Sequence, residues 1–466
     1  MNAPVNLQGY SAEAKKAIMD FMAKYGAGGT EYRDSAYVVT DFDDTVSIFD
    51  ITYQGSVYQL ETLCFAMTPD ELARALAASL DLDEIILDYI HDISNAYRSL
   101  ADRYAITPEG LSEEQLPELH RNPCWLEFAT KMKCLYLYIE ETQEDEIACQ
   151  WITFWCTNMT EEQVYQMFRR ACQAYRNRIS RIVTWTAPAM PDSRIKSASC
   201  TFSQGFCVPK STVNLLRLLS ENGIDIWICS ASNAEAVRAA VDAFELNGYI
   251  TGIIGLTQMM EKGRYVAVYD YENGSPYLNR SGCWEKMAVP LKCLPDREGK
   301  TRAIQNVLIP LYGCGPLAGF MDSSGDFQFC TEFASLKLVI CYNRGARTVE
   351  DGAGLIGIAA LYQQRLGLDL FSANARGDTL YVFQGRDENG FRSLLESDAA
   401  IRCGSRKAKV FEHDENEKLL AFWMRRGFSL AEALNRFAIK TSPEDSETGF
   451  AYGYLEEYNG YHSIAD

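Results

Sequence analysis

The segment Asp41-Phe42-Asp43-Asp44-Thr45 constrains this chain more than any other part of it. It directly follows the apolar run 36–40, which indicates a buried strand. In open α/β sheets ligands bind at the carboxyl edge, so a strand ending in Asp-x-Asp-x-Thr presents two carboxylates and a hydroxyl there. Because side chains alternate along an extended chain, Asp41 and Asp43 are expected to face one pocket. A surface acidic cluster is the alternative interpretation of these five residues taken alone.

Length, charge and cysteine usage limit the classes of function. A chain of 466 residues is too long for one compact core and predicts two or three domains. The net charge of −19 argues against binding to nucleic acid or to an anionic membrane. Fifteen cysteines without a Cys-x-x-Cys pair indicate free thiols in a reducing compartment. No signal peptide or long apolar run is evident. We therefore expect a cytoplasmic location and a small-molecule partner, and the oligomeric state stays unknown.

The periodicity of the chain changes after the first strand. Helical patterns dominate from about Tyr53 onward, and capping boxes at 68–71 and 160–163 mark two helix starts. Alternating strands and helices return near Val208, and a hairpin is expected at 264–278 with its turn at Asn273-Gly274. These patterns predict an α/β fold with a Rossmann-like parallel sheet core and a large, all-helical cap.

The predicted domain boundaries follow from this change. Residues 1–50 are assigned to the first part of the core, 51–200 to the cap and 201–400 to the remainder of the core. Residues 401–466 form a C-terminal extension without an assignment.

Four motifs follow one another in a fixed order at the ends of strands or the starts of helices. They are Asp41-x-Asp43-x-Thr45, then Ser230 after a strand, then Lys300 opening a helix, then Asp322-x-x-x-Asp326 after a strand. Lys286 and Lys292 are alternatives to Lys300, which we prefer because its helix leads to the next strand. This order resembles the four motifs of the haloacid-dehalogenase-like (HAD) superfamily over residues 30–50 and 205–345. The glycine usual before the fourth-motif aspartate is Met321 here.

The resemblance and the residue chemistry together imply a Mg²⁺-dependent phosphatase. A carboxylate attacks a dianionic phosphomonoester only where positive charge is concentrated, and Mg²⁺ prefers oxygen ligands. Asp41 and Asp322 are the expected side-chain ligands, and the resemblance implies the Asp43 backbone carbonyl as a third. Asp326 is expected behind the metal, where it orients water or Lys300.

The phosphate is expected to meet a second group of residues. Lys300 would neutralise it, and the hydroxyls of Thr45 and Ser230 would contact it. The backbone N–H groups of Ala231 and Ser232 are expected at a helix start, which favours anions.

The resemblance assigns the chemistry to the first motif. Asp41 is the expected nucleophile, forming an aspartyl-phosphate, and Asp43 the general acid and base. Within the superfamily the second carboxylate separates phosphatases and phosphomutases from dehalogenases and ion-pumping ATPases. A phosphotransferase or mutase, and a non-enzymatic binding protein for phosphorylated metabolites, are the alternatives.

The insertion resembles a substrate-binding cap. Asp50, Tyr53 and Tyr58 are candidate cap-side contacts, and Asp50 would favour a cationic leaving group. Trp151 and Trp155 share a helix face, which favours core packing, with an aromatic box for a quaternary ammonium as the alternative. Residues 41–65 also look similar to phosphoserine- and phosphorylcholine-phosphatase-like members, which implies a phospho-amino-alcohol substrate.

Overall fold

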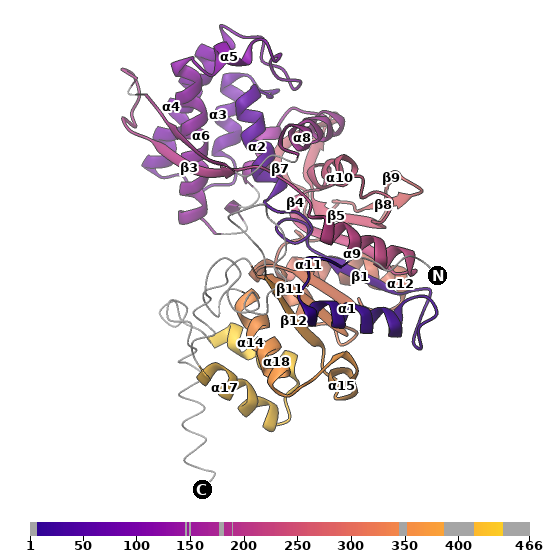
Figure 1. The fold of residues 1–466 in the computed structure, drawn as a ribbon. Helices are drawn as coiled ribbons and strands as arrows, with labels where there is room; N and C mark the ends of the chain where they lie inside the picture. The colour runs from indigo at the N-terminus through magenta and orange to yellow at the C-terminus, as the bar shows by residue number, and fades with distance from the viewer. Residues whose placement is uncertain are drawn as a thin grey trace.

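The centre of the protein is an eight-stranded sheet (Figure 1). The computed structural model describes residues 7–144, 147–148, 151–176, 181–188, 190–343, 352–385 and 414–440. From one edge to the other the strands are β12 (Leu380–Gly385), β11 (Leu338–Asn343), β10 (Ala318–Met321), β1 (Tyr37–Thr40), β4 (Asp225–Asn233), β5 (Gly252–Leu256), β8 (Tyr277–Arg280) and β9 (Cys283–Lys286). The first six are parallel, and β8 and β9 run antiparallel to their neighbours. The predicted α/β fold with a Rossmann-like parallel core is confirmed.

Both faces of this sheet are covered, which explains why its central strands are apolar throughout. Val38 joins one hydrophobic cluster, whereas Tyr37 and Val39 join the other, as alternation along a strand requires. The first cluster extends into the cap, and the helices outside the cap that contribute to it are α1 (Ala12–Tyr25), α9 (Lys210–Glu221), α10 (Ala234–Ala243) and α15 (Leu370–Ala375). Those contributing to the second are α11 (Glu298–Ala303), η2 (Ile304–Leu308), α12 (Ile309–Tyr312), α13 (Phe327–Thr331), α14 (Gly352–Arg365), α17 (Asp414–Arg425) and α18 (Leu430–Lys440).

The register of three central strands sets the position of the site. Thr40 at the end of β1 lies opposite Phe320 of β10 and Ile228 of β4. Residues that follow these strands therefore emerge together at one edge of the sheet, although they are far apart in the sequence.

A large cap lies between β1 and β4. Its helices are α2 (Ile51–Thr62), α3 (Pro69–Ala77), α4 (Glu84–Ala101), α5 (Leu116–Leu119), α6 (Pro123–Thr142), η1 (Ile152–Cys156) and α8 (Glu161–Tyr175). Both predicted capping boxes form, at Thr68 with Glu71 and at Thr160 with Gln163. The cap also contains a hairpin of β2 (Arg181–Thr186) and β3 (Ser199–Gln204), which the sequence patterns did not indicate. The helical cap is thus confirmed, with this two-stranded addition.

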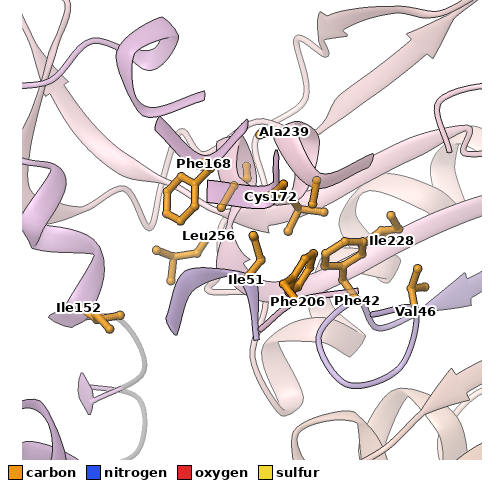
Figure 2. Close-up of a cluster of buried hydrophobic side chains, with 14 of the residues drawn as sticks. Phe42, Val46, Ile51, Ile152, Phe168, Cys172, Phe206, Ile228, Ala239 and Leu256 are labelled. Carbon is orange, nitrogen blue, oxygen red and sulfur yellow. The ribbon is translucent and has the colours of Figure 1, made fainter. Parts of the chain in front are cut away.

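Apolar side chains join the base of the cap to the core (Figure 2). Phe42, directly after β1, packs against Phe206 at a ring distance of 6.4 Å. Phe168 of α8 lies so close to α2 that a Cβ on Gly55 would meet its ring at 2.1 Å. The glycine lets α2 and α8 approach closely, so the first helix of the cap is held in a defined position against α8.

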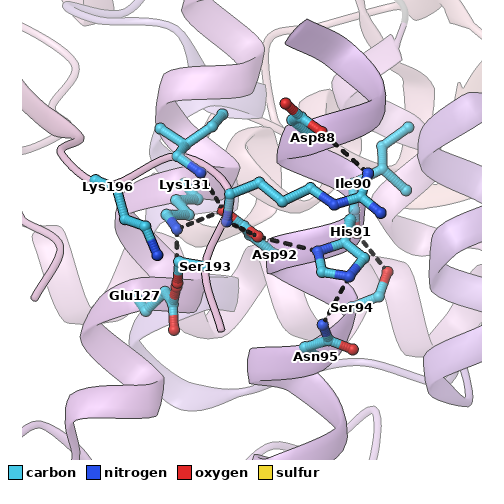
Figure 3. A network of polar contacts seen from close by, with 12 residues as sticks. Asp88, Ile90, His91, Asp92, Ser94, Asn95, Glu127, Lys131, Ser193 and Lys196 are labelled. Atoms are coloured by element: carbon cyan, nitrogen blue, oxygen red, sulfur yellow. Dashed lines mark hydrogen bonds and ion pairs between the residues drawn. The ribbon is translucent and has the colours of Figure 1, made fainter. Parts of the chain in front are cut away.

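A buried polar network ties the segment between β2 and β3 to the helices of the cap (Figure 3). Lys131 of α6 donates to both Asp92 of α4 and Glu127, each at 2.7 Å. Asp92 also accepts from the backbone amides of Arg194 and Ile195. One ammonium thus faces two buried carboxylates, and hydrogen bonds from backbone amides to Asp92 and from Ser193 to Glu127 stabilise the remaining negative charge.

Two sequence predictions need correction or completion. The hairpin runs between β6 (Gln258–Glu261) and β7 (Arg264–Tyr269), and it turns at Lys262-Gly263, both with positive φ. Asn273-Gly274 instead lies in the connection to β8, which pairs with β5.

Within the unassigned extension, α17 and α18 pack beside α14 (Figure 1), while 401–413 and 441–466 lie outside the described residues. None of the described helices combines the length and apolar character that crossing a membrane demands.

Candidate active site

The turn after β1 is held by its own backbone. The Asp41 amide donates to the Phe320 carbonyl of β10 at 3.0 Å, which extends the strand pairing into the motif. The Phe42 carbonyl then accepts from the amides of 45–47. Asp44 adopts a positive φ of 59° and accepts from the Phe49 amide at 2.8 Å. These bonds give Asp41 and Asp43 fixed positions at the sheet edge.

Lys300 lies between two of the predicted acidic residues. Its Nζ donates to Asp41 Oδ1 at 2.6 Å and to Asp326 Oδ1 at 2.5 Å, and all three side chains are buried. The two alternatives lie elsewhere: Lys286 pairs with Glu161 of the cap, and Lys292 is exposed. Of the three lysines, Lys300 is the one in contact with the first and fourth motifs.

Three carboxylates form a compact cluster at the carboxyl edge of the sheet. Ligand oxygens of Asp41, Asp322 and Asp326 all lie within 4.8 Å of one another. Thr45 Oγ1 donates to Asp322 Oδ1 at 3.0 Å, so this hydroxyl orients a carboxylate of the cluster. Oxygen donors at this spacing fit a hard divalent cation such as Mg²⁺. The predicted division between the direct ligands and a supporting Asp326 stays a prediction.

Asp43 contacts a different set of groups. Its Oδ1 accepts from the Ile51 amide at 2.6 Å and its Oδ2 from Ser230 Oγ at 3.2 Å. Ser230 Oγ in turn accepts from the Ser232 amide at 3.0 Å. Asp43 thus joins β1, the start of the cap and the end of β4, which are the elements predicted to meet here.

Strand β4 continues past Ser230 to Asn233, with a register shift after Cys229, because it pairs with β5. Helix α10 starts at Ala234, so Ala231 and Ser232 lie directly before a helix start, as expected. Ala231 and Ser232 line the cavity described below.

Desolvation shifts the protonation equilibria of the site. Burial and then Asp326 raise the pKa of Asp41 to about 7, against the effect of Lys300. Burial raises the pKa of Asp326 to about 6, again opposed by Lys300. Desolvation, Asp50 and Asp41 raise the pKa of Asp43 well above its ordinary value. Burial alone would lower the pKa of Lys300, but Asp326 and Asp41 outweigh it and raise that pKa.

A cavity of about 330 Å³ lies above these groups and is enclosed by both core and cap. The core side includes Asp41, Asp43, Ser230, Lys300 and Asp322. The cap side includes Asp50 and Tyr53 of the α2 start together with Tyr136 and Glu140 of α6. Tyr136, Glu140 and the core residue Arg297 were not predicted from the sequence.

The structure shows which of the other predicted cap-side residues line the cavity. Asp50 lines the cavity and also caps α2, accepting from the Tyr53 amide at 2.7 Å. Tyr58 packs edge-on against Tyr175 and does not line the cavity. Trp151 and Trp155 are fully buried against each other, so the aromatic-box hypothesis for them is wrong and the core-packing interpretation holds.

A buried lysine lies directly behind the cap wall. Lys133 Nζ is 3.3 Å from the ring centroid of Tyr53 and 5.0 Å from that of Tyr136, and none of the described residues forms a hydrogen bond with it. Burial lowers its pKa from 10.5 to about 7, against the effects of Cys200, Glu140 and Asp50. Tyr53 and Tyr136, which line the cavity, therefore lie against the Lys133 side chain, whose pKa is near neutral.

Replacement of Lys133 by methionine should change how stability depends on pH. Because the folded pKa is depressed, the wild type carries a charge penalty that is greatest below about pH 7 and is relieved as pH rises toward 10.5. The free energy of unfolding of Lys133→Met relative to wild type should therefore fall by about 2 kcal/mol between about pH 6 and about pH 9. Urea unfolding at both pH values measures it. Exposed Lys196→Met is the control, and its free energy of unfolding relative to wild type should not change with pH. If the difference for Lys133→Met is also independent of pH, the depressed pKa of Lys133 is contradicted.

Comparisons with known proteins bear on the fold. No family model and no curated protein matches the sequence. A conserved protein of unknown function from Anaerococcus prevotii DSM 20548 matches with a TM-score of 0.66 and 24% identity, over 85% of this chain and 98% of that chain. A protein of unknown function from Bordetella pertussis Tohama I has a TM-score of 0.31 and 14% identity, over 66% and 89% of the two chains.

Cytosolic 5'-nucleotidase IIIB bound to cytidine has a TM-score of 0.27 and 12% identity, over 71% of this chain and 78% of that chain. Scores as low as these last two carry no argument about this chain. The topology of this chain is consistent with the expected HAD-like fold: a parallel Rossmann-like sheet, a cap inserted after the first strand, and acidic groups at the carboxyl edge of the central strands.

Proposed function

We propose that this protein is a Mg²⁺-dependent phosphatase that hydrolyses a small phosphomonoester through an aspartyl-phosphate on Asp41. The observation that carries the proposal is the position of Lys300, whose Nζ contacts Asp41 and Asp326 within the carboxylate cluster. A carboxylate attacks a dianion only when cations offset the repulsion, and a buried ammonium at the nucleophile does this.

The donor set supports the metal. Asp41 and Asp322 would hold the ion, Asp326 would support it from the same cluster, and Thr45 would keep Asp322 oriented toward it. When bound, Mg²⁺ supplies charge neutralisation for the phosphoryl oxygens. The supporting hydrogen bonds are already formed within the protein, so the cluster is organised before any ligand enters.

The side chains support a two-step reaction. A carboxylate oxygen of Asp41 attacks phosphorus, the bond from phosphorus to the leaving oxygen breaks, and Asp43 protonates that oxygen. Water then attacks phosphorus, Asp43 takes its proton, and the bond from phosphorus to Asp41 breaks. The desolvation and neighbouring carboxylates that act on Asp43 favour the protonated form needed in the first step. Ser230, hydrogen-bonded to Asp43, would hold its orientation.

The cap wall supports a phospho-amino-alcohol as the substrate. Asp50 and Glu140 place two carboxylates on the side of the cavity formed by the cap, and Tyr53 and Tyr136 add aromatic surface. Carboxylates and aromatic faces both attract an ammonium group. A substrate with a phosphate at one end and an ammonium at the other complements this distribution. The volume of about 330 Å³ is in the range of small-ligand sites.

Loss of the Asp41 nucleophile tests the proposed reaction. Phosphate release from a panel of phosphorylated metabolites should be observed for the wild type with Mg²⁺ and should fall by about 1,000-fold or more in Asp41→Asn. Exposed Asp70→Asn is the matched control and should retain full activity. Melting temperatures show whether each variant is folded. Undiminished activity of a folded Asp41→Asn protein would rule out this nucleophile.

Glu140→Gln tests the proposed substrate class. The KM for choline phosphate and ethanolamine phosphate should rise by about 2- to 5-fold, because an exposed ion pair contributes up to about 1 kcal/mol. The KM for glycerol phosphate, which lacks the ammonium, should stay unchanged. Glu141→Gln serves as the control, because the neighbouring residue Glu141 does not line the cavity. Equal changes for charged and neutral leaving groups would contradict an ammonium site.

A further inference from the structure

The side chains that line the cavity include far more acidic than basic groups. Seven carboxylates line it, and among the described residues that line it only two are cations, Lys300 and Arg297. The seven are Asp41, Asp43, Asp44, Asp50, Glu140, Asp296 and Asp322. Lys300 already contacts Asp41 and Asp326, so its charge is divided between two buried carboxylates. A phosphomonoester brings about two further negative charges, and Arg297 is the second cation positioned to meet them.

Arg297 has an unusual backbone conformation for its residue type. Its φ of 48° and ψ of −121° belong to a region that favours glycine. The turn is held by bonds from the Gly299 amide to the Asp296 carbonyl at 2.7 Å and from the Lys300 amide to the Arg297 carbonyl at 3.1 Å. A large charged residue at a position where glycine would be unstrained indicates that its side chain has a function.

The turn also brings Arg297 close to the phosphoryl-transfer groups. Lys300 lies three residues later, in the first turn of α11, so both basic side chains start from one short segment. On its other side the turn touches the loop after Asp322, where a Cβ on Gly325 would lie 3.4 Å from Asp296 Oδ1. Arg297 thus directly precedes the helix carrying Lys300, its neighbour Asp296 lies beside the loop after Asp322, and Arg297 lines the same cavity as both Lys300 and Asp322.

We propose that Arg297 is a substrate-binding residue whose guanidinium donates hydrogen bonds to the non-bridging oxygens of the transferring phosphoryl group. This inference rests on the proposed function and adds to it a residue outside the four motifs. A planar guanidinium matches two phosphate oxygens at once, which a lysine ammonium does not. The contact is to the phosphoryl group and not to the leaving group, so its loss affects all substrates alike.

Arg297→Gly separates function from architecture, because glycine adopts this backbone conformation without strain while the guanidinium is removed. We expect kcat/KM to fall by about 100-fold for choline phosphate and glycerol phosphate alike. Protection of the protein by inorganic phosphate in thermal denaturation should weaken in parallel. The melting temperature without ligand should be equal to or higher than that of the wild type. Arg297→Lys should recover only part of the activity.

Arg302→Gln is the matched control, because Arg302 lies on the helix that follows Arg297 but is exposed and pairs with Glu298. Wild-type kinetics and phosphate protection in Arg297→Gly would overturn the proposal, as would a loss confined to one leaving group. If the wild type is active but Arg297→Gly is unchanged, only this inference fails. If the wild type neither hydrolyses phosphomonoesters nor is protected by phosphate, the proposed function and the role of Arg297 fail together.

Discussion

The ion pairs of Lys300 with Asp41 and Asp326 are the constraint on which the site depends. Carboxylates packed within 4.8 Å of one another repel strongly in a desolvated site, and an unpaired buried charge costs several kcal/mol. The ammonium resolves this conflict only if three distant segments of the chain are held in place around it. The parallel register of β10 and β1 brings Asp41 and the loop carrying Asp326 to one edge of the sheet, and α11 brings Lys300 to them.

The cap completes a cavity whose two sides differ in chemistry. The core side carries the lysine, the hydroxyls and the carboxylate cluster, whereas the cap side carries Asp50, Glu140 and two tyrosine rings. Lys133 behind these rings places a titratable ammonium next to the wall without exposing it. Apolar packing between Gly55 and Phe168 holds the cap helices α2 and α8 together, so the cap side of the cavity has a defined position.

Local signals predicted much of this arrangement, and tertiary contacts decided the rest. The apolar run of β1 and the capping boxes at Thr68 and Thr160 depend on neighbouring residues, and they formed as predicted. The end of β4 depends on pairing with β5, which local turn signals do not report. Trp151 and Trp155 share a face, but only the docking of η1 determines that this face is buried.

The residues missed by sequence analysis lie where elements from different parts of the chain meet. Glu140 and Tyr136 are one turn apart on α6, yet their role depends on which face of that helix turns toward the core. Arg297 could have been found in the sequence because it lies three residues before Lys300, but its backbone conformation could not be predicted from the sequence.

Detection of a covalent phosphoryl group on Asp41 tests the central claim most directly. The protein would be mixed with choline phosphate or acetyl phosphate and Mg²⁺, quenched in acid within the first turnover, and digested for peptide mass spectrometry. We predict that the mass of one phosphoryl group is added to the peptide containing Asp41 and is absent in Asp41→Asn. A phosphorylated residue elsewhere, or substrate turnover by direct attack of water without any labelled peptide, would contradict the account.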